Sequence, residues 1–227
     1  MKIFLIKNIA YLISFLFITI VYGCGNSDTF TDIDGNIYHS VQIGKQTWMV
    51  ENLKTTRFRN GDTIAQQDTK TGWKATDLPA YSAYNLENSN IKDYGLLYNW
   101  YCIGDKREIA PKGWRIPTET DLNELLQFIG SDTIAATLLK EAGNLHWLPS
   151  PTTGTNSTGF SARPGGYRDV NGNFYMRQSN GYYWTTQGSF EMYHWSSRVF
   201  QAFANIQRDP VFMKYGFSIR CIKDTDQ

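Results

Sequence analysis

The 227-residue chain has little cysteine and little histidine, with three residues of each. The histidines His39, His146 and His194 are scattered, and none lies three or four positions from another or beside a cysteine. Because zinc needs several such ligands close together, a zinc centre has little support, and each histidine is interpreted as a surface or partly buried side chain. We expect no metal and no other cofactor.

Two common signatures of catalysis are also missing. The sequence holds no Gly-x-Ser-x-Gly element for a serine nucleophile and no P-loop for a phosphate group. The acidic residues Glu119, Asp121 and Glu124 fall on one predicted helix, where helix-start charge and solvation explain them. We therefore predict no catalytic residue. An uncharacterised envelope enzyme, with a perturbed titratable group in a pocket, stays the alternative.

The chain lacks an excess of charge of either sign. It has 22 basic and 21 acidic residues, and no internal repeat of fixed period. A balance this close to zero gives no electrostatic reason to expect nucleic acid as a partner.

The first 23 residues have the pattern of a signal peptide. Lys2 and Lys7 precede an apolar stretch from Ile9 to Tyr22, and Gly23 precedes Cys24. The stretch is shorter than the roughly 20 residues that span a bilayer untilted, and no charged stop-transfer cluster follows it. A retained anchor helix is the alternative interpretation.

The sequence Val21-Tyr-Gly-Cys24 resembles the lipobox of bacterial lipoproteins. The resemblance implies that Cys24 is lipidated, with a diacylglycerol thioether and an amine-linked acyl chain such as palmitate; several chains anchor stably where one would not. Residues 24–29 are then a short tether. We expect a lipoprotein of the cell envelope at the outer membrane, on its periplasmic face or at the cell surface.

Two cysteines remain, Cys102 and Cys221. Outside the cytoplasm disulfides persist, so an even pair favours a bridge over two free thiols. Its loop would exceed 100 residues, which in the chain-entropy model stabilises the fold by about 4–5 kcal/mol.

Short strands are predicted at both ends of the chain. Residues 37–43 alternate between two turns, and a second strand follows over residues 47–53. Residues 149–166, rich in Thr, Ser, Asn, Pro and Gly, predict a long loop. Four aromatic segments after it predict strands of one sheet, over residues 173–177, 181–186, 196–204 and 215–222.

Three helices are predicted. Thr118 caps the clearest one, Asp121 lies three residues on, and Gly130 ends it; the apolar stripe of this helix is Leu122, Leu125, Leu126 and Ile129. Weaker patterns indicate helices over residues 132–141 and 96–101.

A set of phrases, in this order and spacing, closely resembles the Fibrobacter succinogenes major paralogous domain. They are residues 31–38, 43–53, 95–100, 111–118, 156–160, 164–168 and 215–221. The family consists of exported and often lipid-anchored bacterial proteins, and the resemblance covers about residues 30–223, leaving a tail over 224–227.

This family is similar in turn to the C-type-lectin-like superfamily. The resemblance implies a single α+β domain with a mixed, mainly antiparallel sheet, two or three short helices and long loops. It also implies a bridge between a first-helix and a last-strand cysteine, which here would be Cys102 and Cys221. The formylglycine-generating enzymes of the superfamily use a pair of active-site cysteines, so their activity is not expected here.

Calcium-dependent sugar binding in lectin-like domains uses a Glu-Pro-Asn or Gln-Pro-Asp loop and a later Trp-Asn-Asp, and this chain has none of them. The cluster Asp32-Ile-Asp-Gly-Asn36 begins like a calcium loop but lacks the distal bidentate glutamate. We interpret it as a hairpin turn, with a metal site as the alternative.

Aromatic side chains are the remaining candidates for ligand contact. Strand alternation over residues 181–186 puts Tyr182 and Trp184 on one face, with Trp184 expected in the core, and Tyr183 on the other. Tyr183, Tyr193 and Trp195 are the candidate exposed rings, able to stack on sugars or anchor a protein partner. Core packing is nevertheless the favoured interpretation for them, since aromatic residues are usually buried.

These observations favour a non-catalytic recognition module of the envelope, held to the membrane by the lipid on Cys24, for glycans or a surface protein. A structural or adhesive envelope subunit is the first alternative and an envelope enzyme the second.

Overall fold

The computed structural model of the chain describes residues 28–130, 134–190, 193–200 and 206–224. Side chains are described throughout these ranges except in residues 187–190, 193–200 and 206–209. Strands in the described part form three sheets, of five, five and three strands, and short helices cover them. The predicted α+β class with a mainly antiparallel sheet, short helices and long loops is confirmed.

The first sheet joins the two ends of the chain. Its strands, in spatial order, are β1 (Thr29–Thr31), β2 (Ile37–Ile43), β3 (Gln46–Met49), β13 (Ile222–Lys223) and β7 (Trp114–Arg115). The strand predicted over residues 37–43 is confirmed at both ends, because a tight turn bounds it on each side. The second strand is shorter than predicted.

The turn between β1 and β2 is built on the Asp32 carboxylate. Its Oδ1 accepts hydrogen bonds from the backbone N–H groups of Asp34 and Asn36, at 3.0 and 2.9 Å. Its Oδ2 accepts from the Tyr38 hydroxyl at 2.6 Å. The predicted hairpin turn is therefore confirmed, and this carboxylate orders the loop itself.

The second sheet is made of the later strands. Its order is β12 (Ile206–Phe212), β11 (Tyr193–Phe200), β10 (Asn180–Phe190), β8 (Gly165–Arg168) and β9 (Phe174–Arg177). Three of the four aromatic segments fall on β9, β10 and β11, as predicted, although residues 201–204 of the third lie outside the described residues. The fourth does not: residues 216–218 form single bridges to Arg168, Tyr98 and Tyr183, and β13 lies in the first sheet. This segment crosses between sheets, so alternation alone could not assign it to one.

The strongest helix prediction is confirmed. Helix α4 (Glu119–Ile129) has Thr118 and Asp121 in a reciprocal capping box and ends at Gly130, which has the left-handed φ of 80°. The weaker helices are only partly confirmed. Helix α5 spans Ala135–Leu139, and residues 132 and 133 of the predicted range lie outside the described residues. Helix α3 spans Trp100–Ile103, whereas Leu97–Tyr98, predicted as helix, form a strand that pairs with Ala80–Ser82.

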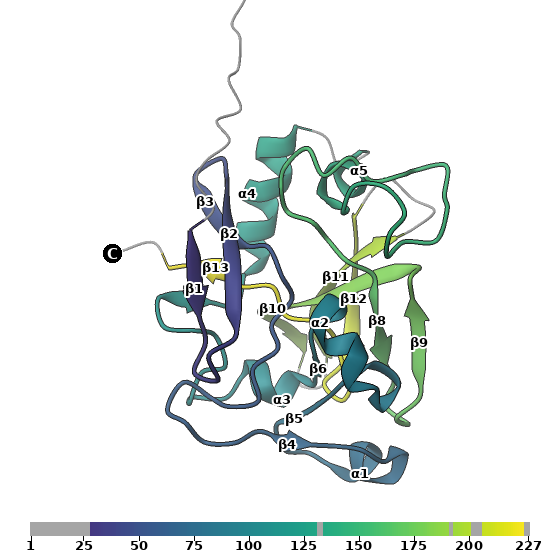
Figure 1. The fold of residues 1–227 in the computed structure, drawn as a ribbon. Coiled ribbons are helices and arrows are strands. Elements are labelled where there is room, and N and C mark those ends of the chain that lie inside the picture. The colour runs from purple at the N-terminus through teal and green to yellow at the C-terminus, as the bar shows by residue number, and fades with distance from the viewer. Residues whose placement is uncertain (1–27, 131–133, 191–192, 201–205, 225–227) are drawn as a thin grey trace, which may run out of the picture.

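A small third sheet, two more α-helices and two short 3-10 helices, η1 (Tyr84–Leu86) and η2 (Asn88–Asn90), complete the described part of the domain. The sheet contains β4 (Ala65–Gln66), β5 (Ala80–Ser82) and β6 (Leu97–Tyr98), and the helices are α1 (Lys70–Ala75) and α2 (Ile91–Tyr94). Figure 1 shows α1, α3 and the third sheet at one end of the molecule, and the β2–β3 turn with the last residues of α4 at the other.

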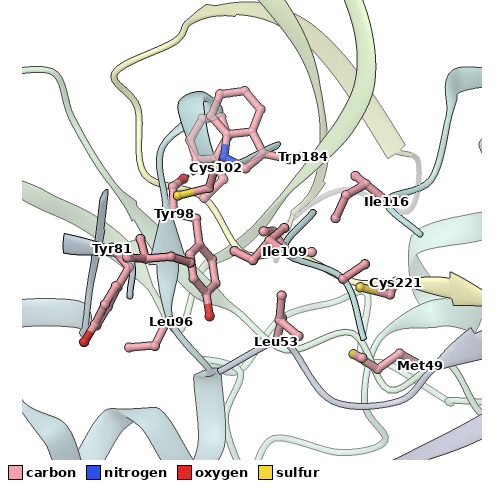
Figure 2. Packing of buried hydrophobic residues seen from close by; sticks show 14 of the residues in the cluster. Met49, Leu53, Tyr81, Leu96, Tyr98, Cys102, Ile109, Ile116, Trp184 and Cys221 are labelled. Carbon is pink, nitrogen blue, oxygen red and sulfur yellow. Dashed lines mark hydrogen bonds between the residues drawn. The ribbon is translucent and has the colours of Figure 1, made fainter. Parts of the chain in front are cut away.

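Two hydrophobic clusters fill the interior, and β10 separates them. Tyr182 and Trp184 belong to the larger cluster and Tyr183 to the smaller one, beneath α4 and α5. The prediction that Trp184 lies in the core is confirmed (Figure 2). Because both faces of β10 are covered, alternation along this strand does not separate buried from exposed rings.

Candidate functional site

The three candidate aromatic residues do not form an exposed cluster in the described structure. Tyr183 is only 7% exposed, and its hydroxyl exchanges hydrogen bonds with the backbone N–H and carbonyl of Arg163. Tyr183 is therefore not an exposed ring, and the favoured interpretation of core packing is confirmed for it, because β10 is covered on both faces. The side chains of Tyr193 and Trp195 lie outside the described residues, as does Cys24.

The expected disulfide is not formed in this structure, where Cys102 and Cys221 are both free and buried. They belong to the same hydrophobic cluster, and Figure 2 shows them apart, with Ile109 drawn between them. The Cys102 thiol instead donates to the Ala80 carbonyl at 3.4 Å. Burial raises the pKa of both thiols, which keeps them protonated.

The described histidines each pair with a carboxylate. His39 lies on the surface, with Nδ1 2.6 Å from Glu51. His146 is nearly buried, with Nδ1 2.6 Å from Glu141 and Nε2 3.8 Å from Asp93. The side chain of His194 lies outside the described residues.

The His146–Glu141 pair is the arrangement closest to acid–base chemistry in the part of the chain described. A carboxylate that orients an imidazole is what a general base requires, together with a substrate group or nucleophile within reach of the other nitrogen. Here Nε2 faces Asp93, and no described hydroxyl or thiol is hydrogen-bonded to it. Arg163 donates to Glu141 at 3.1 Å and also pairs with Asp93 of α2. These ion pairs connect α2 to the loops around it.

An open groove of about 310 Å³ is lined by residues of α3, of the loop after α1 and of the turn that ends β12. Figure 1 shows α1 and α3 at one end of the molecule. We call this groove the Phe212 groove, and its lining residues are Asp77, Tyr101, Val170, Phe212, Met213 and Lys214. Phe212 is 43% exposed, so part of this aromatic residue is accessible to solvent. The groove thus combines an accessible ring with a carboxylate, an ammonium and a phenol.

One turn positions most of this lining. The N–H of Tyr215 donates to the Phe212 carbonyl at 3.0 Å, which closes the turn after β12. The indole of Trp73, buried in α1, donates to the Lys214 carbonyl at 3.0 Å. Helix α1 is thereby fixed against the turn, and Asp77, two residues after α1, lines the groove together with the residues of the turn.

A buried arginine holds α1 in place. The Arg168 guanidinium lies over the Trp73 ring, 4.5 Å from its centroid, and donates to the carbonyls of Gln67 and Thr69 at 2.6 and 3.0 Å. Burial lowers the pKa of Arg168 to about 10, so it stays charged at neutral pH. Its role is structural, since it satisfies carbonyls just before the helix begins.

The polar side chains of the Phe212 groove form one hydrogen-bonded group. Asp77 Oδ1 accepts from Lys214 Nζ at 2.9 Å and from the Tyr101 hydroxyl at 3.0 Å. The hydrogen bond from Lys214, followed by that from Tyr101, holds the pKa of Asp77 below its usual value. Partial burial and the bond to Asp77 raise the pKa of Tyr101. At neutral pH the groove therefore offers both hydrogen-bond donors and acceptors.

A cluster of tyrosines adjoins the same turn. The Tyr167 ring of β8 packs at 5.4 Å from Tyr175 and 5.7 Å from Tyr215, between ring centroids. Burial raises the pKa of Tyr167 to about 12. Tyr175 is exposed, so this cluster presents aromatic surface beside the strands that carry the groove.

Sequence reasoning did not find these groove residues. They come from four separate places in the chain, between Asp77 and Lys214, and no local spacing marks them. The aromatic segment over residues 215–222 was predicted as a strand. The groove is lined instead by the turn just before this segment.

The described residues offer no evident site for a metal ion or a membrane span. No group of three or more His, Cys, Asp or Glu side chains among them is arranged to hold a metal. No helix within the described ranges has the length and apolarity needed to cross a bilayer.

Comparison with known proteins gives one finding. Neither the curated proteins nor the solved structures contain a match to this chain. The Fibrobacter succinogenes major domain, in contrast, matches residues 41–223, which is most of the sequence and includes every residue of the Phe212 groove. The chain therefore belongs to the Fibrobacter succinogenes major domain family.

Proposed function

We propose that this protein is a lipid-anchored recognition module of the bacterial envelope that binds glycans in the Phe212 groove without catalysis. The observation that carries the proposal is the composition of the groove: an exposed ring beside a hydrogen-bonded carboxylate, ammonium and phenol. A sugar presents an apolar face and a rim of hydroxyls, and this lining complements both.

The anchoring half of the proposal rests on the sequence before the domain. The leader pattern and Cys24 support export and lipidation at the outer membrane. The likeness of the family to lectin-like domains supports a recognition role, and it is part of the proposal.

Because the sequence lacks the calcium-loop motifs, the proposed binding of glycans does not depend on a metal ion. Asp77 and Lys214 would contact sugar hydroxyls directly, and the Phe212 ring would cover the apolar face of the sugar. The two side chains are already oriented by each other and by Tyr101, which reduces the entropy lost on binding.

A glycan array tests this function. The protein, made as residues 24–227 with Cys24→Ser to keep it free of lipid, is expected to bind a set of glycans saturably, with and without chelator. Phe212→Ala should weaken binding about tenfold or more, because a ring contact contributes about 1.5 kcal/mol. Asp77→Asn should weaken it as well, while Leu145→Ala, at an exposed leucine outside the groove, should not.

Other outcomes favour the other functions. Silence across a broad array would contradict glycan binding and favour a structural or adhesive subunit, or an envelope protein as the ligand. Turnover of a bound glycan that is lost in His146→Ala would favour an enzyme, because His146–Glu141 is the pair best suited to proton transfer.

A further inference from the structure

A second groove lies at the opposite end of the molecule from the Phe212 groove. It has a volume of about 550 Å³ and lies between the β2–β3 turn and the last residues of α4. We call it the Phe128 groove; its lining includes Ile43, Gly44, Lys45, Glu124, Gln127 and Phe128. Phe128 is 57% exposed, although its helix α4 buries Leu122 and Leu125 in the core.

Phe128 is held outward by a close contact with the turn. Gly44 has a φ of +62°, and a Cβ there would lie 2.8 Å from Cδ2 of the Phe128 ring. Only glycine both adopts this backbone conformation readily and leaves room for the ring. The ring therefore rests on the turn as a fixed apolar projection, with the exposed Lys45 beside it.

The described chain begins close to this groove. The Asp28 carbonyl accepts hydrogen bonds from the N–H and the hydroxyl of Ser40, at 3.0 and 3.1 Å. Because β1 and β2 are antiparallel, the described chain begins on the side of β1 that is nearer to Ile43 than to Ile37. Cys24 lies four residues before Asp28, a span of at most about 14 Å in extended chain.

We propose that the Phe128 groove docks on the bilayer surface into which the lipid of Cys24 inserts. This inference rests on the lipid anchor of the proposed function. Anchoring at Cys24 keeps the groove within a few nanometres of the membrane, so even a weak contact is favoured by its high effective concentration. An exposed ring with a neighbouring lysine suits the boundary between acyl chains and anionic headgroups.

Site-directed spin labelling tests the docking. The full lipidated chain carries Gln127→Cys in the Phe128 groove or, as a matched control, Asn171→Cys beside the Phe212 groove. Both positions are exposed, while Cys102 and Cys221 are buried and do not compete for the label. Each protein is inserted into vesicles of phosphatidylethanolamine and phosphatidylglycerol, and reduction of the nitroxide by ascorbate is timed.

The label at position 127 is expected to be reduced at least about tenfold more slowly than the label at 171, as partition of the Phe128 ring into the interface implies. Adding Phe128→Ser should remove most of the protection while the protein still floats with the vesicles. Equal rates on floating protein would overturn the docking and leave an envelope protein as the occupant. Protein that carries no lipid by mass and does not float would overturn the anchor, and the docking with it.

Discussion

At the scale of single residues, the buried cysteines and the buried lysine show how environment sets chemistry. Cys102 and Cys221 lie in one hydrophobic cluster without bonding to each other, and Lys140 is buried although its amine is charged in water. Burial raises the pKa of a thiol and lowers that of an amine, because it disfavours the charged form of each.

The two thiols are expected to be unreactive in the folded protein. Ellman's reagent added without reductant should label neither Cys102 nor Cys221, and should label both once the chain is unfolded, because burial blocks access and holds the thiols protonated. Unfolded protein that yields no thiol until it is reduced would show that the disulfide forms after all.

Lys140 is expected to make stability depend on alkaline pH. Its Nζ donates to the Thr152 carbonyl at 2.5 Å, and burial lowers its pKa from 10.5 to about 8. Between these two values the unfolded chain binds more protons than the folded one, so the lysine's contribution to stability rises with pH.

Urea titrations give the unfolding free energy of the parent protein minus that of Lys140→Met. This value should become more positive by about 1–3 kcal/mol between pH 8 and 10.5. The exposed Lys112→Met variant controls for the loss of one charge. A difference that stays level over this range would contradict the assignment.

At the scale of elements, structure that depends on neighbouring residues could be predicted from the sequence, and structure that depends on distant contacts could not. Thr118, Asp121 and Gly130 specify α4 because a helix is capped by its own neighbours in sequence. Tyr183 was misplaced because its burial depends on α4 and α5, which cover the second face of β10. The cysteines were predicted to pair because their number is even and because disulfides persist outside the cytoplasm. Neither argument says how far apart the two residues lie in the fold.

The Phe212 groove depends on an element that holds little structure by itself. Helix α1 has six residues, too few for independent stability, and Arg168 and Trp73 attach it to the domain. Short helices of this kind follow from tertiary contacts, which explains why residues 70–75 gave no signal in the sequence.

Arg168→Ala is expected to destabilise the domain by about 3 kcal/mol or more, because it leaves buried carbonyls without donors. Amide exchange should accelerate most in α1, and glycan binding should weaken in proportion. The partly exposed Arg57→Ala, which removes an ion pair with Asp34, should cost less than about 1 kcal/mol. Equal losses in the two variants would argue against the role given to Arg168.

At the scale of the whole molecule, the two grooves lie at opposite ends (Figure 1). If the Phe128 groove faces the membrane, the Phe212 groove faces away from it and stays accessible. A glycan found on the array should therefore bind the vesicle-anchored protein and the lipid-free protein with affinities within about twofold, a difference below 0.5 kcal/mol. Binding that is lost on vesicles would contradict this orientation.

The position of β13 has a consequence for when the domain can fold. This strand, Ile222–Lys223, lies between β3 and β7, so the last residues of the chain complete a sheet begun by the first. When the chain emerges from its N-terminus onward, this sheet stays incomplete until β13 has appeared, since the pairing joins residues far apart in sequence. The domain therefore closes late, which would suit the export proposed for this protein, since an exported chain stays extended until it has crossed the membrane.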